Sequence, residues 1–261
     1  MADKLLADIR IILVEPAGAL NVGSVARVMK NMGLEKLVLV KPDCDPLGEE
    51  ARRMAVHGVD VLENAQIVEN LPEALQGCQR AIATTARSRS LLTPLELPRE
   101  ALPWLLGENL TSALIFGPED RGLNNIELNY AQRFVGIPAN PEYPSLNLAQ
   151  AAALCAYEMY QAAIQQENQP PTTESSFDPS LAPATLDSLE GYYQQLESVL
   201  LKIGYLYPHT AASRMEKFRH LFNRANLSHQ EVAMLRGILS QVEWAFSHSK
   251  FLYSREQETE Q

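Results

Sequence analysis

The segment from Glu15 to Gly33 holds the residue types most suited to chemistry. It reads EPAGALNVGSVARVMKNMG and follows a short apolar run. At about 100° per residue, its valines and methionines share one helix face, and Asn21, Ser24 and Arg27 lie on roughly the opposite, polar face. Such groups at the carboxyl end of a strand can hold a polar ligand. The alternative is an ordinary surface helix that is capped by Asn21 and leaves Arg27 in solvent.

The glycines of this segment exclude a common nucleotide site. Gly18 and Gly23 are spaced as in a P-loop, but Ser24 and Val25 follow where that motif requires Lys and then Ser or Thr. No G-x-G-x-x-G fingerprint follows a strand either. Nucleotide hydrolysis is therefore not expected, and no dinucleotide site is indicated.

Two further segments place small or polar residues directly after apolar runs. In FGPEDRGL, Gly117 and Gly122 frame a tight loop that exposes backbone N–H groups to a ligand. Its Glu119 can accept hydrogen bonds from neighbouring backbone or from a polar substrate. ATTARSR ends an apolar run with small hydroxyl residues and adds the charges of Arg87 and Arg89. Each segment alone is also compatible with an ordinary turn.

A proline-rich segment precedes a long Ala-rich stretch. Three prolines hold IPANPEYPSLNLAQ extended and stiff. Ser145 or Asn147 can cap the helix that follows, and the N-terminus of that helix favours hydrogen-bond acceptors such as a carboxylate.

The elements that would position these residues alternate along the first two thirds of the chain. Short, nearly continuous apolar runs are typical of parallel strands buried on both faces. Strands that alternate with helices predict an α/β domain with a parallel sheet. Strands are expected at Ile9–Val14, Lys36–Val40, Arg80–Thr84, Ala113–Phe116 and Arg133–Ile137, and helices at Val22–Met32, Leu71–Leu75 and Leu146–Gln165.

Composition changes after residue 166. Residues 167–184 contain four prolines and few large apolar residues, which indicates a flexible linker. It would join an α/β domain at residues 1–166 to an α-helical module at residues 185–261, with helical spacing at Leu186–Leu206 and Ala211–Phe246. Cations of the module form either an ordinary solvated face or a contact surface for RNA phosphates. They are Arg214, Lys217, Arg219 and Arg224.

Overall composition narrows the class of protein. With 22 Lys and Arg against 32 Asp and Glu in 261 residues, the net charge is −10, so only a local basic patch would attract nucleic acid. Cys44, Cys78 and Cys155 are far apart and lack zinc-ligand spacing, so no metal site is expected. No run of about 18 apolar residues predicts a membrane span. The first ten residues also lack the basic start of a signal peptide, which favours a cytoplasmic protein.

The order of these segments resembles that of the SPOUT superfamily of RNA methyltransferases. Three motifs match in sequence, N-x-G-S-V-A-R at Asn21–Arg27, F-G-P-E-x-x-G-L at Phe116–Leu123 and S-L-N-L-A at Ser145–Ala149. The longer form ANPEYPSLNLAQA, followed by a helical extension, resembles the TrmJ type. That type methylates the ribose 2′-oxygen, of cytidine or uridine, at position 32 of the tRNA anticodon loop. The resemblance covers the α/β part and continues more loosely into the helical module.

The resemblance implies a parallel sheet whose C-terminal segment threads a loop as a deep trefoil knot, a rare arrangement. It implies a homodimer with an active site shared between subunits, tRNA as substrate and S-adenosylmethionine as methyl donor. The residues implied to bind that cofactor are Thr84, Thr85, Ala86, Gly117, Glu119, Gly122, Ile137, Pro144, Ser145 and Leu146. Those implied to bind RNA near the active site are Asn21, Ser24, Arg27 and Arg87.

Arg27 and Ser145 are the implied catalytic residues. The methyl group of S-adenosylmethionine is already activated by its bond to positively charged sulfur. The enzyme must therefore only align the ribose 2′-hydroxyl with the methyl group and provide for removal of the hydroxyl proton. Arginine stays protonated above about pH 12. Arg27 therefore either stabilises the developing oxyanion or orients a phosphate or water that takes the proton. Pro144 stands where close relatives often have a serine. A binding role of that hydroxyl would be lost here, whereas a role of the backbone carbonyl alone would be kept, because proline removes only an N–H.

Two other functions stay open on the sequence alone. The same chemistry can act on another tRNA or rRNA ribose, such as the wobble nucleotide, although minimal wobble-ribose members largely lack the helical module. A non-catalytic RNA-binding protein with this fold is disfavoured, because all of the motif residues are present together.

Overall fold

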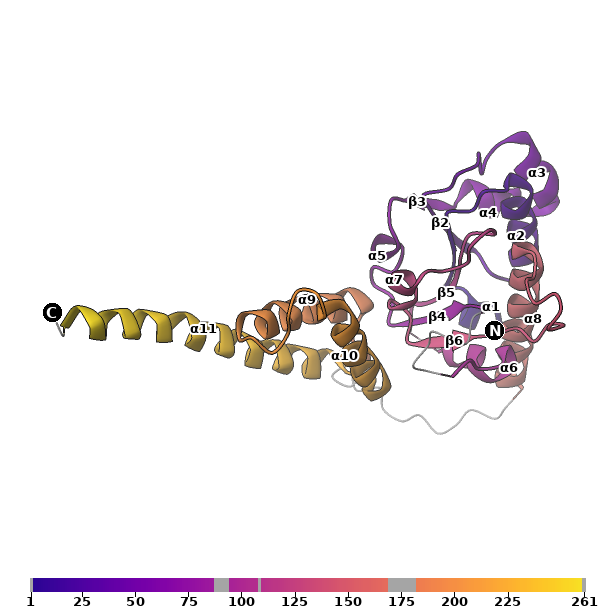
Figure 1. Cartoon of the computed structure of the whole chain (residues 1–261). Helices are drawn as coiled ribbons and strands as arrows, with labels where there is room; N and C mark the ends of the chain where they lie inside the picture. The colour runs from indigo at the N-terminus through magenta and orange to yellow at the C-terminus, as the bar shows by residue number, and fades with distance from the viewer. Residues whose placement is uncertain (1, 87–93, 108, 169–181, 260–261) are drawn as a thin grey trace. The chain divides into compact units, whose positions relative to one another are not determined.

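Six short strands form one parallel sheet in the first part of the chain (Figure 1). The computed structural model describes residues 2–86, 94–107, 109–168 and 182–259. The strand order is β3-β2-β1-β5-β4-β6, and all neighbouring strands are parallel. The predicted α/β class with a parallel sheet is confirmed. The strands are β1 Ile9–Val14, β2 Lys36–Val40, β3 Gln66–Val68, β4 Arg80–Thr84, β5 Ser112–Phe116 and β6 Arg133–Val135.

Both faces of the sheet are covered, which explains its apolar strands. Every residue of β5 is buried, and so are five of the six residues of β1. The main core joins Leu13 of β1 to Val22 and Val25 on one side of the sheet. The helices on that side include α1 Ala2–Leu6, α2 Ala19–Asn31 and α8 Leu148–Glu167, with α6 Pro98–Ala101 packed against α8. Those on the other side include α5 Leu71–Ala74 and α7 Asn125–Leu128 (Figure 1).

β3 is not among the predicted strands, and β6 ends two residues earlier than predicted. β3 is an edge strand of three residues, two of them exposed, so no buried apolar run reveals it. After Val135 the chain leaves the sheet, and the Gly136 N–H donates to the carbonyl of Glu96. Ile137 is thereby released to line a cavity rather than to extend the strand.

Helix α2 begins earlier than expected because Gly18 is its N-cap. Gly18 makes no side-chain capping bond, and Asn21 lies within the first turn of the helix. The alternative in which Asn21 caps α2 is therefore wrong, and the Asn21 amide remains available for other contacts.

Two glycines let the backbone of α2 approach its neighbours closely. A Cβ on Gly23 would lie 2.2 Å from the carbonyl oxygen of Ala51 in α3 (Glu49–Ala55). A Cβ on Gly58, at the end of the 3-10 turn that follows α3, would lie 2.8 Å from the carbonyl oxygen of Ala26. Gly23 thus serves helix packing and not a phosphate-binding loop.

Helix α8 follows the proline-rich segment and is capped by Asn147. The Asn147 side-chain oxygen accepts hydrogen bonds from the backbone N–H groups of Ala149 at 2.9 Å and Gln150 at 3.3 Å. Of the two predicted caps, Asn147 and not Ser145 therefore fills the position. The helix begins and ends two residues later than expected.

The chain divides near residue 175 into two compact units. The second unit contains three helices with their own core, in which Tyr192 and Phe222 meet edge to face at 5.2 Å between ring centroids. Its helices are α9 Leu186–Lys202, α10 Ala211–Ala225 and α11 His229–Thr259. The long stretch expected to be helical from Ala211 is interrupted at Asn226, which adopts a left-handed conformation with φ of 51°.

The bounds of the expected linker differ from the structure at both ends. Glu167 still belongs to α8, and residues 169–181 lie outside the described part of the chain. The Ala184 N–H donates to the carbonyl of Leu227 at 2.8 Å, and the His229 N–H donates to that of Ala182 at 3.3 Å. Residues 182–184 therefore pair with the connection between α10 and α11.

Candidate active site

A cavity of about 380 Å³ opens at the carboxyl ends of β4, β5 and β6. Its walls come mainly from the segments that follow these strands, at the edge where parallel sheets place ligands. All of the residues that the resemblance assigns to the cofactor line this one cavity. They are Thr84, Thr85, Ala86, Gly117, Glu119, Gly122, Ile137, Pro144, Ser145 and Leu146.

Apolar side chains that the sequence analysis did not single out complete the lining. Phe116, Leu123, Val135 and Leu148 are buried, and each also borders the cavity. Their residue types indicate only a core position, so the fold was needed to place them at the site.

The loop Gly117–Gly122 is as tight as its two glycines suggest. A Cβ on Gly117 would lie 2.3 Å from the backbone nitrogen of Leu123, so the loop closes onto its own backbone. Gly122 has a φ of +65°, a conformation that side chains disfavour. The loop therefore borders the cavity with backbone as well as with side chains.

Glu119 ties this loop to the start of α2. Its carboxylate accepts hydrogen bonds from the backbone N–H of Ala17 at 3.1 Å, the backbone N–H of Gly18 at 3.2 Å and the Asn21 amide at 2.8 Å. Burial alone would raise the pKa of Glu119, but these hydrogen bonds, with that of Asn21 the strongest, outweigh burial and lower it. Glu119 is therefore a charged acceptor at neutral pH.

Asn21 also bonds to the residue that caps α8, and so links the loop to that helix. While its amide nitrogen donates to Glu119, its oxygen accepts a hydrogen bond of 2.9 Å from the amide nitrogen of Asn147. Asn147 is also the N-cap of α8. The chain Glu119–Asn21–Asn147 thus joins one residue from each of the three sequence motifs.

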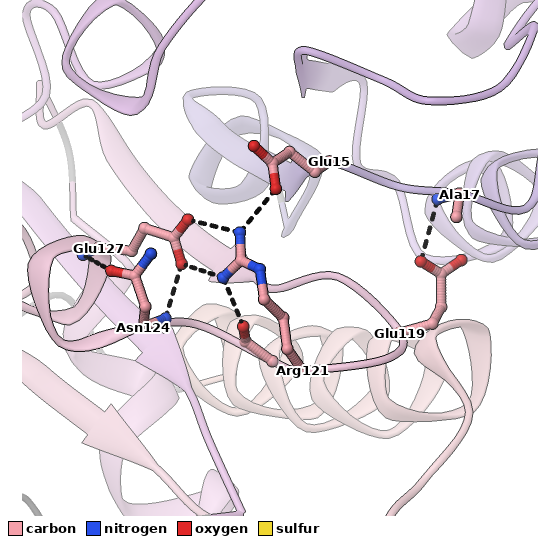
Figure 2. Close-up of polar contacts among 7 residues, drawn as sticks. Glu15, Ala17, Glu119, Arg121, Asn124 and Glu127 are labelled. Carbon is pink, nitrogen blue, oxygen red and sulfur yellow. Dashed lines mark hydrogen bonds and ion pairs between the residues drawn. The ribbon is translucent and has the colours of Figure 1, made fainter.

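Arg121 fixes the other side of the same loop (Figure 2). Its guanidinium group donates to both carboxylate oxygens of Glu127 at 2.9 and 3.0 Å and to Glu15 at 2.6 Å. These bonds, those to Glu127 first, raise the pKa of Arg121 further above its usual range. Glu119 turns away toward Ala17 in the same view. No role was predicted for Arg121, because neither Glu15, which follows β1, nor Glu127 in the capping box of α7 was recognised as its partner from the sequence.

The two implied catalytic residues occupy different places. Ser145 borders the cavity on an exposed part of the proline-rich segment. Arg27 lies on the exposed face of α2, as its helical position predicts, and makes no hydrogen bond or ion pair within the described residues. It is not among the residues that line the cavity. Ser24 donates its hydroxyl to the carbonyl of Leu20 at 2.7 Å.

The expected phosphate-binding cations of the helical unit divide into two groups. Arg214, Lys217 and Arg224 are exposed on α10. Arg219 instead donates to both carboxylate oxygens of Glu190 in α9, at 2.6 and 2.8 Å, and its guanidinium carbon lies 4.5 Å from the ring centroid of Tyr193. Arg219 therefore holds α10 against α9. Arg87 lies outside the described residues.

We accordingly expect Arg219→Ala to destabilise the helical unit rather than to remove a phosphate contact. The partly buried Glu190 would lose its partner, and a cost of about 1.5–3 kcal/mol is typical for hydrogen bonds to charged groups. Thermal unfolding followed by circular dichroism measures this, with Arg224→Ala as the exposed control. Equal stability of the two variants would contradict a structural role for Arg219.

Neither a metal-ligand cluster nor a membrane-spanning helix occurs among the residues with described positions. No three His, Cys, Asp or Glu side chains in the described ranges are grouped so as to hold a metal ion. Within the same ranges, no helix combines the length and apolar character that crossing a membrane requires.

Two family models match the chain, one for each compact unit. The model described as the SpoU rRNA Methylase family matches residues 8–157. The model of the C-terminal domain of tRNA methyltransferase TrmJ matches residues 187–256. Together they cover the three motifs and nearly all of α9, α10 and α11.

Individual relatives agree with these models. The tRNA (cytidine/uridine-2′-O-)-methyltransferase TrmJ of Pectobacterium atrosepticum is 44% identical over 243 residues, 92% of this chain and 98% of that protein. The crystal structure of TrmJ from Z. mobilis ZM4 is 32% identical, with a TM-score of 0.78 over 91% of this chain and 100% of that one. The SpoU methyltransferase AviRb from Streptomyces viridochromogenes, solved with AdoMet, shares the fold at 20% identity and a TM-score of 0.50, over 61% of this chain and 62% of that one. The chain therefore belongs to the SpoU methylase family and, within it, to the TrmJ methyltransferases.

Proposed function

We propose that this methyltransferase transfers a methyl group from S-adenosylmethionine to the ribose 2′-oxygen of cytidine or uridine at position 32 of tRNA. The observation that carries the proposal is the hydrogen-bonded chain Glu119–Asn21–Asn147, which brings the three motifs together beside one cavity. Relatives that are 44% identical over most of the chain are named as tRNA methyltransferases of cytidine and uridine ribose. A tRNA substrate also favours a cytoplasmic location.

The residues of the cavity fit S-adenosylmethionine. The volume of about 380 Å³ lies in the usual range of small-ligand sites, roughly 300–1,000 Å³. Val135 and Leu148 offer apolar surface for a nucleobase, and the backbone of Gly117–Gly122 offers polar groups for its edge. Glu119 and Asp120 bring negative charge, which suits a sulfonium cation. When bound, the cofactor supplies a methyl group on positively charged sulfur.

The protein must then place the ribose hydroxyl in line with that methyl group and stabilise the oxygen as its proton leaves. Ser145 is at the cavity rim, where its hydroxyl can hydrogen-bond the ribose. Arg27 carries a permanent charge and so cannot itself take the proton. Its proposed role is to hold a phosphate beside the ribose and to stabilise the developing negative charge. Asn21 positions the RNA backbone.

We also propose the homodimer with a shared active site. Arg27 is exposed on α2, without a partner in the described chain, and does not line the cavity of its own subunit. A second copy that presents its Arg27 to this cavity would complete the site. The deep trefoil knot belongs to the same proposal. What supports it is that the segment after β6 borders the same cavity as the segments after β4 and β5.

Methyl transfer from tritiated S-adenosylmethionine to unmodified tRNA transcripts, followed by mapping of the labelled nucleotide, tests the proposed function. We expect label on the 2′-oxygen at position 32. Label on another ribose would keep the chemistry but reject the assigned position. No label on any tRNA, despite cofactor binding, would overturn the proposal.

Arg121 offers a test of the cofactor site that does not depend on RNA. Replacement of Arg121 by alanine removes the ion pairs to Glu127 and Glu15, so we expect the loop Gly117–Gly122 to lose order and S-adenosylmethionine affinity to fall about tenfold. Isothermal titration calorimetry measures the affinity. Arg52→Ala is the matched control, because its ion pair with Glu63 at 2.8 Å joins residues outside the cavity lining. Unchanged affinity in the Arg121 variant would contradict a role in ordering the loop.

A further inference from the structure

The connection between α9 and α10 presents two tyrosines to solvent. Tyr205 and Tyr207 are 54% and 55% exposed, whereas Leu206 between them is buried in the core of the helical unit. Leu206 thereby anchors the loop, and the alternation turns both rings outward. Gly204, with a φ of +77°, allows the chain to turn from α9 into this loop.

Both rings are held in place by neighbours. The Arg214 guanidinium donates to the backbone carbonyl of Tyr205 at 3.0 Å and lies 5.9 Å from the centroid of its ring. Tyr207 stacks on His209 at 6.0 Å between centroids and 26° between planes. Exposed aromatic rings that are already ordered lose little conformational entropy when a flat ligand stacks on them.

A stripe of exposed side chains on α10, three of them basic, begins at Arg214, which contacts Tyr205. At about 100° per residue, Arg214, Lys217, Leu221 and Arg224 fall within an arc of about 80°, and the stripe extends about 15 Å along the helix. All four are exposed. On the same count, Glu216 is about 200° from Arg214 and does not interrupt the stripe.

We propose that Tyr205 and Tyr207 form a stacking platform for unpaired bases of the RNA substrate, and that the adjoining backbone runs along the stripe from Arg214 to Arg224. This inference rests on the proposed tRNA substrate and adds where, and in which direction, it binds the helical unit. Proteins bind single-stranded RNA by aromatic stacking on bases combined with cations on phosphates. Stacking accepts any base, so such a platform binds unpaired nucleotides without requiring a particular sequence. A protein partner is less favoured, because the Arg214 guanidinium lies 5.9 Å from the centroid of the Tyr205 ring and begins the stripe of cations, although Ile203 and Leu221 also expose apolar surface.

The two parts of this surface differ in their response to salt. Each phosphate contact contributes a slope of about 0.7–0.9 to the fall of log affinity with log salt, whereas stacking contributes none. We therefore expect the double variant Tyr205→Ala and Tyr207→Ala to bind tRNA at least tenfold more weakly with an unchanged slope. The double variant Lys217→Ala and Arg224→Ala should lower the slope by about 1.4–1.8. Tyr205→Phe with Tyr207→Phe keeps both rings and should bind like the wild type.

The measurement is fluorescence anisotropy titration of full-length protein at several salt concentrations. The RNAs are a tRNA transcript, its anticodon stem-loop and a fully paired duplex of the same stem. The alanine pair should lose affinity for the first two and not for the duplex. Wild-type tRNA affinity, a reduced salt slope or an equal loss on the duplex would each overturn the platform. Tyr207→Ala alone, whose ring contacts His209 at the surface, repeats the test with little risk to folding.

Methyl transfer by the wild-type protein to the same tRNA is followed in parallel. If the wild-type protein methylates no ribose of this tRNA, the proposed function is contradicted. The binding data then still test whether Tyr205 and Tyr207 stack on RNA bases. Normal methylation by the wild type, together with unaltered tRNA binding by the alanine pair, overturns the platform alone.

Discussion

Replacement of Arg27 by alanine is expected to reduce turnover at least ~100-fold, equivalent to ~2.7 kcal/mol in the activation barrier. The side chain is exposed on α2 and makes no hydrogen bond or ion pair in the described structure, so its loss should leave folding unchanged. Its proposed contact is an RNA phosphate and not the cofactor, so S-adenosylmethionine affinity of the free enzyme should stay within about twofold. Single-turnover methylation of tRNA measures the chemical step, and calorimetry measures cofactor binding.

Two control variants test whether the effect is specific to the Arg27 guanidinium group. Lys30→Ala removes another exposed cation of the same helix, one that is paired with Asp60 at 2.6 Å, and should keep most activity. Arg27→Lys keeps the charge but loses the planar, forked geometry of the guanidinium group, and should recover only part of the rate. Near-normal turnover of the alanine variant would remove Arg27 from the mechanism.

Replacement of Glu119 by alanine is expected to produce the second-largest loss, about 30-fold in kcat/KM. The variant leaves the N–H groups of Ala17 and Gly18 and the amide of Asn21 without their acceptor. Loss of about 2 kcal/mol is typical for hydrogen bonds to a charged group, and it would release the loop Gly117–Gly122 from α2. The loss in kcat/KM is measured by steady-state kinetics, first with varied S-adenosylmethionine at saturating tRNA and then with varied tRNA at saturating S-adenosylmethionine.

The matched variant Glu119→Gln keeps an acceptor oxygen but removes the charge and its pH dependence. The pKa of Glu119 is lowered in the folded protein, so its contribution to stability is present above its ordinary value of 4.5 and is lost as the pH falls through the folded value. The stability difference between wild type and Glu119→Gln should therefore be largest near neutral pH and shrink below pH ~4.5. Thermal unfolding at pH 7 and at acid pH measures it, and a constant difference would contradict the assigned hydrogen bonds.

The sequence was informative wherever a local pattern determines structure. Apolar runs located five of the six strands, and helical periodicity placed Arg27 on the exposed face of α2. β3 was not predicted, because it is short and mostly exposed. The helices α3 and α4 (Val59–Glu63) escaped because each has seven residues or fewer, too short for a clear period.

Local sequence patterns could not predict contacts between residues that are far apart in the chain. Glu119 was recognised as an acceptor, but its partners lie 98 to 102 residues away in sequence, and only the strand order brings them together. For Arg121, the partner Glu15 is equally distant, at 106 residues, whereas Glu127 lies only six residues away and was not recognised because the capping box of α7 was not predicted. Arg219 is different, because at about 100° per residue it lies about 140° from Arg214 and so faces away from the basic stripe. Helical geometry alone already separates it from the phosphate-binding candidates.

The two glycine contacts along α2 bear on how this enzyme tolerates mutation. Gly23 meets the carbonyl of Ala51, and a Cβ on Gly58 would lie 3.1 Å from the Cα of Arg27 itself. Both glycines lie outside the cavity lining, yet their close backbone contacts help to set the position of the helix that carries Arg27. Saturation mutagenesis scored by activity should accept only glycine at both positions. Such a screen would mark as catalytic two residues that act solely as spacers between backbones.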